Sequence, residues 1–209
     1  MWPAHALSDT NGVTVLLVVG AGGEPQFETN FVQQARLWEK AARQAGAQTI
    51  TIGLEEARET NHCAQLKRQL AAEPHEGLNP LWLVLIGHGT FDGKEAKFNL
   101  QGPDVSAAEL AEQLKPFRRP ILVVNTASAS APFVAALSAT NRVVITATRS
   151  GHEQNFTRLG QYLAGPCRAA KRPGPGRPDF APGGLLARQR SRGRVLPDRG
   201  PPGDGARLD

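Results

Sequence analysis

Cysteine is scarce in this sequence of 209 residues, which contains two cysteines, Cys63 and Cys167. Two cysteines cannot form a disulfide framework, and the C-x-x-C spacing of a metal site does not occur. Cys63 falls within a helical pattern, where we expect a packed or surface thiol and not a nucleophile. The sequence therefore excludes a fold that depends on disulfides, and it indicates no metal site.

Long hydrophobic runs are also missing, since no apolar stretch approaches the ~20 residues that a membrane-spanning helix needs. Residues 1–12 have neither a basic start nor a hydrophobic stretch, so we expect no signal peptide, and the compartment stays open. A basic stripe with interleaved aromatic residues is absent too. The formal charge of +5 comes from residues 166–209, while residues 1–165 are close to neutral. We therefore expect neither a membrane nor a nucleic-acid partner.

What the sequence does have is a regular alternation of two patterns. Apolar runs typical of buried strands occur at 13–19, 48–52, 81–86, 120–125 and 142–147. Helical patterns occur at 28–45, 61–72, 106–114 and 130–137, the third of them opened by a capping box of Ser106 and Glu109. Asp92-Gly93 predicts a small hairpin within residues 90–101. The alternation predicts an α/β domain of three layers, in which helices cover both faces of a mostly parallel sheet.

The chain divides into three regions: an N-terminal extension (1–12), the α/β domain (13–165) and a tail (166–209) rich in proline, glycine and arginine. The tail shows neither hydrophobic period and has too little apolar surface to offset chain entropy, which predicts disorder. A second hypothesis is a frameshift. Residues 195–208 are amino acids that GC-rich codons can encode, and such codons read one base out of frame allow a string of ordinary helical composition. The nucleotide sequence of the gene distinguishes the two.

In an open parallel sheet, ligands bind beyond the carboxyl ends of the strands. His88 comes directly after the strand 81–86 and has a glycine on each side. Flanking glycines let the backbone approach a ligand closely, and their amides are placed to donate hydrogen bonds to a developing oxyanion. An imidazole at this position is suited to act as a general base near neutral pH. The alternative is a structural histidine in a tight turn.

A second polar segment follows the strand 120–125, where small residues lead into a helix that begins near Ser130. A nucleophile in such a turn is exposed, and the amides of the helix favour negative charge beside it. The alternative is a serine that merely caps the helix. The spacing favours the cap for Ser130 and leaves both roles open for Ser128.

These two segments carry a resemblance to a known family. A strand that ends in His-Gly is followed, ~40 residues later, by a strand that ends in a turn of small residues. The segment 127–131 reads Ala-Ser-Ala-Ser-Ala where the legumain pattern is Ala-Cys-Glu-Ser-Gly, and Thr146-Ala147-Thr148 stands where that pattern ends near Thr-Ala-Ser. Residues 13–165 thus resemble the legumain/caspase clan of peptidases. The resemblance implies a caspase-like fold.

The same resemblance assigns roles to three residues. It implies that His88 is the general base, that Gly89 supplies an oxyanion-hole amide, and that Ser128 occupies the position of the catalytic cysteine. A serine hydroxyl is far less acidic than a thiol, so its proton must be removed during the attack itself. The sequence shows no third residue placed to orient His88 except Asp92, a candidate four residues further on in the predicted hairpin. Ala129 replaces the acidic residue that helps legumain bind asparagine, so asparagine specificity is not implied.

Two functions follow from this comparison. The first is a peptidase-like hydrolase, weak or inactive as written, that acts on a peptide or protein. In it the amides of Gly89 and Ser128 bind the oxyanion, and Arg149, Thr148 and Ser130 line the substrate site. Arg149 is suited either to bind a substrate carboxylate or to hold its own loop. The second is a non-catalytic binding or scaffolding module on the same fold.

A cofactor-binding domain is a third reading. Gly20-Ala-Gly-Gly23 follows the first strand, as a dinucleotide-binding turn does. Pro25 follows, however, the G-x-G-x-x-G pattern is not completed, and no acidic residue ends the strand 48–52 to hold a ribose. We therefore expect no cofactor.

Overall fold

The computed structural model describes residues 12–54 and 60–164. The tail (166–209) and most of the N-terminal extension (1–12) lie outside the described residues. The two hypotheses about the tail, disorder and a frameshift, therefore concern residues outside the described part. The described part corresponds closely to the α/β domain predicted from the sequence. None of its helices is both long and apolar enough to cross a membrane.

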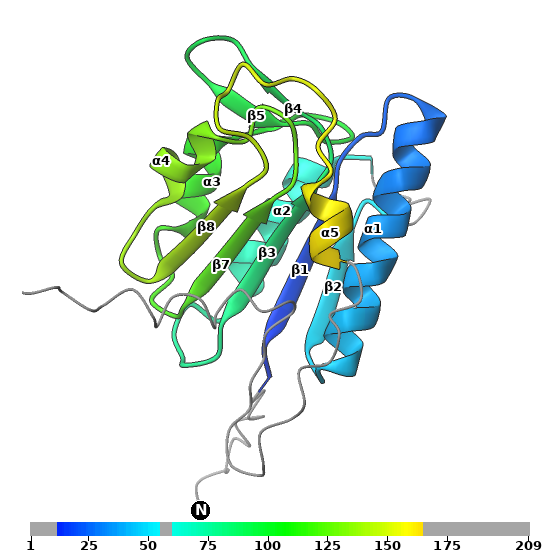
Figure 1. Cartoon of the computed structure of the whole chain (residues 1–209). Helices are drawn as coiled ribbons and strands as arrows, with labels where there is room; N and C mark the ends of the chain where they lie inside the picture. Colours follow the sequence, from blue (N-terminus) through cyan, green and yellow to red (C-terminus); the bar gives the residue numbers. More distant parts are fainter. Residues whose placement is uncertain (1–11, 55–59, 165–209) are drawn as a thin grey trace, which may run out of the picture. The chain divides into compact units, whose positions relative to one another are not determined.

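A five-stranded sheet runs through the middle of the domain, with the strand order β2-β1-β3-β7-β8 and every neighbouring pair parallel (Figure 1). The strands are β1 (Thr14–Val19), β2 (Gln48–Ile52), β3 (Leu81–Ile86), β7 (Ile121–Asn125) and β8 (Arg142–Thr146). The central strands are apolar throughout because both faces of a parallel sheet are covered. The predicted three-layer α/β fold is confirmed.

Helices cover both faces of this sheet (Figure 1). The helix α1 (Pro25–Gln44) and the short helix α5 (Leu159–Ala164) lie together on one face. The other face carries α2 (His62–Ala72), α3 (Ala107–Leu114) and α4 (Pro132–Leu137). Along β3 the side chains alternate between the two layers. Leu81, Leu83 and Leu85 join the core under α2, α3 and α4, and Trp82 contacts Trp38 of α1 at a ring distance of 6.2 Å.

A smaller antiparallel sheet of β4 (Gly89–Phe91), β5 (Ala96–Phe98) and β6 (Val105–Ser106) follows β3. Its first two strands form the hairpin that Asp92-Gly93 predicts, because glycine at position 93 adopts the positive φ of 94° that the turn requires. The capping box of α3 is present as predicted, with reciprocal bonds between Ser106 and Glu109.

Three local predictions need correction. The first helix begins at Pro25, three residues before the predicted start, because proline is well placed in a first turn where no amide donor is needed. The short elements β6 and α5 were not predicted. Ser130 does not cap α4 with its side chain: the N-cap is Ala131, and no side-chain cap bond forms there.

Candidate functional site

The loops that carry His88 and Ser128 lie side by side, because β3 and β7 are adjacent parallel strands paired from Leu81 with Ile121 to Leu85 with Asn125. Each strand is held in the core by its apolar residues, and its polar continuation emerges at the same edge of the sheet. The two segments singled out in the sequence therefore meet in the folded domain.

The side chain of Ser128 is hydrogen-bonded to the backbone of Gly89, the residue that follows His88. Its Oγ accepts a hydrogen bond from the Gly89 N–H at 3.1 Å and donates one to the Gly89 carbonyl oxygen at 3.0 Å. The hydroxyl is buried, and its single proton is used by the Gly89 carbonyl. In this arrangement the serine does not donate to His88. The Gly89 amide that the resemblance assigns to the oxyanion hole already has an acceptor.

Glycine is required at position 89 for a steric reason. A Cβ atom built there would lie 2.3 Å from the backbone oxygen of Ser128 and 3.1 Å from that of Lys97. Real Cβ atoms do not approach a backbone oxygen so closely, so any other residue would push the two loops apart. The glycine after His88 is thus explained by the close contact of the β4 start with the turn after β7.

The turn that holds Ser128 has an unusual backbone. Ala129 has a φ of 51°, and it is the one non-glycine residue with positive φ in the described part of the chain. A left-handed conformation costs an alanine roughly 1–2 kcal/mol. Hydrogen bonds compensate, with the Ala129 N–H donating to the Glu153 carbonyl at 2.8 Å and the Ala127 N–H to Asn125 Oδ1 at 3.0 Å. Strain of this kind is concentrated at functional turns.

The backbone donors of this turn are not all bonded within the described part of the chain. The N–H of Ser128 has no hydrogen-bond partner among the residues the structure describes.

The imidazole of His88 packs among aromatic rings. Phe27 and Phe31 of α1 meet it edge to face, at ring distances of 4.8 Å and 5.0 Å. Phe156 completes the cluster, 5.5 Å from Phe27 and 6.3 Å from Phe31. Within the described ranges the ring has no hydrogen bond or ion pair. Aromatic packing, and not an acidic residue, orients the histidine.

Sequence reasoning missed two members of this cluster. Phe27 was not singled out, although it lies one helical turn before the predicted core residue Phe31 and so on the same face of α1. Phe156 comes from an irregular loop, where no periodic signal exists.

Asp92 does not take part in the site. Its Oδ1 accepts the backbone N–H groups of Lys94 and Glu95, each at 2.8 Å, within the β4–β5 turn. These two bonds lower the pKa of the Asp92 carboxyl, and the bond from the Glu95 N–H has the larger effect. The carboxylate serves the hairpin turn.

The predicted substrate residues Ser130 and Thr148 are both buried and bound to each other. Ser130 Oγ accepts the N–H groups of Ala147 at 3.1 Å and Thr148 at 3.3 Å, and it lies 3.3 Å from Thr148 Oγ1. Thr148 Oγ1 in turn accepts the Ala131 N–H at 3.0 Å. The two hydroxyls join the end of β8 to the turn before α4.

Arg149 has a different setting, since 96% of its side chain is exposed. Its Nε lies 3.9 Å from Glu153 Oε1, and its backbone N–H donates to the same oxygen at 3.0 Å. These contacts join the two ends of its own loop, and the exposed guanidinium still leaves room for a substrate carboxylate.

The glycine loop after β1 uses its backbone groups within the protein. The Gly20 N–H donates to the Ile86 carbonyl at 2.8 Å, and the Ala21 N–H donates to the Asn99 carbonyl at 3.1 Å. Residues 12–54 and 60–164 contain no group of three or more side chains that could hold a metal ion.

Comparisons with known proteins identify no family for this chain. No protein-family model matches the chain, and no curated protein matches it either. Among solved structures, the crystal structure of protein GSU0716 from Geobacter sulfurreducens is similar at 14% sequence identity and a TM-score of 0.40. The match covers 72% of this chain and 62% of that one, so this chain spans less than two thirds of the length of its neighbour.

Proposed function

We propose that the domain is a peptidase-like hydrolase of low activity, in which His88 is the general base and Ser128 the nucleophile. One observation carries the proposal: Ser128 Oγ lies 3.1 Å from the backbone N–H of Gly89, the residue after the histidine. A nucleophile beside a backbone donor is the arrangement that acyl transfer needs, because the oxyanion forms next to the attacked carbon.

Ser128 Oγ attacks the substrate carbonyl carbon while its proton moves to His88, and the carbonyl electron pair becomes an oxyanion facing the Gly89 and Ser128 amides. Collapse of this intermediate expels the leaving amine, which takes the proton from His88. Water then hydrolyses the acyl-enzyme by the same sequence of steps.

The low activity follows from the two bonds between Ser128 and Gly89. The hydroxyl must leave the Gly89 carbonyl before it can donate to an imidazole, and the Gly89 amide must exchange the hydroxyl for the oxyanion. Each hydrogen bond contributes about 1 kcal/mol. A hydroxyl also lacks the easily ionised state of a thiol.

The two bonds also favour the second candidate, a non-catalytic binding module. In that case the Ser128 hydroxyl only links the two loops, and its hydrogen bonds to Gly89 are never broken. The two functions differ in one measurable property, the reactivity of the Ser128 hydroxyl.

Covalent labelling with a fluorophosphonate tests the proposal. We expect slow labelling of Ser128, located by mass spectrometry of the labelled peptide and lost in Ser128→Ala and His88→Ala. Ser138→Ala is the matched control, because it removes an exposed hydroxyl from the end of α4 and should label like the wild type. Labelling no faster than that of folded Ser128→Ala would refute the hydrolase and leave the binding module.

Ser128→Cys provides a second measurement. A thiolate is a far better nucleophile than a hydroxyl. We expect this variant to cleave peptides from a panel that varies the residue before the scissile bond. Its failure on every member of the panel would indicate that more than the nucleophile has been lost.

A further inference from the structure

The strand β2 (Gln48–Ile52) forms one edge of the main sheet, with β1 on its inner side. No strand of the described part of the chain pairs with its outer side. Edge strands are commonly protected by lysine, proline, a bulge or a covering element. The sequence of β2, Gln-Thr-Ile-Thr-Ile, includes neither lysine nor proline, so two of these common protections are absent from it.

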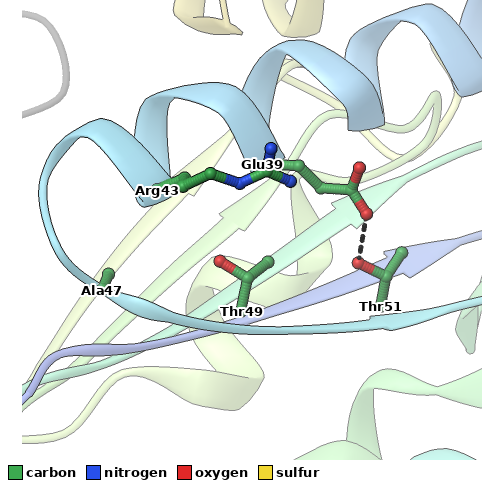
Figure 2. A pocket seen from close by; sticks show the side chains of 5 residues that line it. All are labelled: Glu39, Arg43, Ala47, Thr49 and Thr51. Carbon is green, nitrogen blue, oxygen red and sulfur yellow. Dashed lines mark hydrogen bonds between the residues drawn. The ribbon is translucent and has the colours of Figure 1, made fainter.

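A polar groove of about 290 Å³ accompanies this edge where α1 lies over β2. It is lined by Glu39 and Arg43 of α1 together with Ala47, Thr49 and Thr51 (Figure 2). Figure 2 shows Thr49 and Thr51 pointing from the strand toward the helix.

The two charges in the groove differ in how they are satisfied. Glu39 accepts hydrogen bonds from Thr51 Oγ1 and from Arg36, both at 2.9 Å, which fixes its carboxylate over the strand. Arg43 is exposed and has no ion-pair partner within the residues described. The edge thus presents a fixed anion and, one helical turn away, a cation for which the described part of the chain provides no ion pair.

This spacing suits pairing with an identical edge. Since β1 and β2 are parallel, α1 runs antiparallel to β2. Four helical residues rise by ~6 Å, and two strand residues advance by ~6.6 Å. Glu39 therefore stands near Thr51 and Arg43 near Thr49. When two β2 strands pair antiparallel about a two-fold axis at Ile50, Thr49 lies opposite the partner's Thr51. Arg43 then lies beside the partner's Glu39. Because of the two-fold symmetry, this contact forms twice.

We propose that two copies of the chain associate through antiparallel pairing of their β2 strands, which forms one continuous ten-stranded sheet across the dimer. Backbone hydrogen bonds supply the pairing, and the two Arg43–Glu39 contacts fix its register. A second copy fits better than an unrelated extended peptide, because the two-fold axis supplies a counter-charge for both arginines. The dimer is independent of the proposed hydrolase.

Sedimentation velocity of the full chain over a range of concentrations tests the interface. The wild type is expected to form dimers, and Arg43→Glu to raise the dimer Kd roughly tenfold, since it removes two ion pairs and sets like charges against each other. The double variant Arg43→Glu with Glu39→Lys exchanges the charges and should recover most of the wild-type affinity. Lys94→Glu makes the same charge reversal in the β4–β5 turn and should leave the Kd unchanged.

Each other outcome overturns the inference. A wild type that stays monomeric at every concentration would mean that β2 does not pair with a second copy. A dimer that Arg43→Glu does not weaken would have its interface elsewhere. Failure of the charge exchange to recover affinity, in a variant that circular dichroism and melting temperature show to be folded, would refute the proposed register.

Discussion

A methyl group at position 89 should separate the two loops of the candidate site. In Gly89→Ala the new Cβ would lie 2.3 Å from the backbone oxygen of Ser128 and 3.1 Å from that of Lys97. Both atoms belong to the backbone, so neither can move away by changing a rotamer. The start of β4 or the turn after β7 must therefore shift.

The expected cost is about 2 kcal/mol of unfolding free energy, within the range that overpacked sites lose when backbone shifts are forced. For a domain of this size that corresponds to a fall in Tm of roughly 4–8 °C. The same displacement pulls the Gly89 backbone away from Ser128 Oγ. Reactivity at Ser128 should therefore change together with stability.

Urea denaturation followed by far-ultraviolet circular dichroism measures this loss, with an unchanged m value as the sign that the folded state stays compact. Gly12→Ala is the matched control, because a Cβ at position 12 meets no heavy atom within 4 Å. We expect that control to stay within about 0.5 kcal/mol of the wild type. Equal stability of the two variants would refute the close contact between the loops.

Three further predictions concern the rest of the domain. Glu73→Gln should destabilise it by about 3 kcal/mol in chemical denaturation, because the buried guanidinium of Arg119, 3.4 Å away, would lose its counter-charge. Phe133→Ala should cost about 3–5 kcal/mol in the same assay, since this side chain is 1% exposed in the core under α4. Bonds from the Ser106 backbone and from Lys67 lower the pKa of Glu109. The stabilising effect of the Glu109 carboxylate is therefore present above its unfolded pKa and is lost as pH falls through its folded pKa. Glu109→Gln should therefore lower the free energy of unfolding more at pH 7 than at pH 3.

The strands and long helices were predictable because their residues are arranged by burial. The strand β3 reads as a continuous apolar run since both its faces are covered, and its observed bounds match the prediction. Likewise, Phe31, Ala35 and Trp38 follow the helical period, and all of them are buried on α1. Hydrophobic period is a local property, so a single sequence reveals it.

The candidate site was predictable in position but not in its bonds. The alternation of strands and helices predicts parallel strands, whose carboxyl ends bring His88 and Ser128 to one edge of the sheet. The order of the strands, which makes β3 and β7 neighbours, was not predicted. Whether the serine proton is shared with an imidazole or with the Gly89 carbonyl depends on side-chain rotamers and on sub-ångström loop positions. The role of Ser130 was misjudged for the same reason, because its hydroxyl accepts the N–H groups of Ala147 and Thr148, which follow β8 and are distant in sequence.

The hydroxyl at position 128 has a structural task that a comparison with cysteine peptidases obscures. It satisfies the N–H and the C=O of Gly89 at once, with bonds of 3.1 Å and 3.0 Å in a buried place. Ser128→Ala should leave both groups unpaired and cost about 1–3 kcal/mol of unfolding free energy. Ser128→Cys should lose part of the same stability, because a thiol is a weak donor and acceptor.

Denaturation of the three proteins therefore separates two reasons for a serine here. If serine gives the most stable protein, cysteine the next and alanine the least stable, the residue at position 128 links the two loops through its hydrogen bonds to Gly89. Any hydrolysis must then first break these hydrogen bonds. Ser128→Ala as stable as the wild type would contradict the hydrogen bonds themselves. The hydroxyl would then be free to turn toward His88, and the low activity that we propose would lose its physical cause.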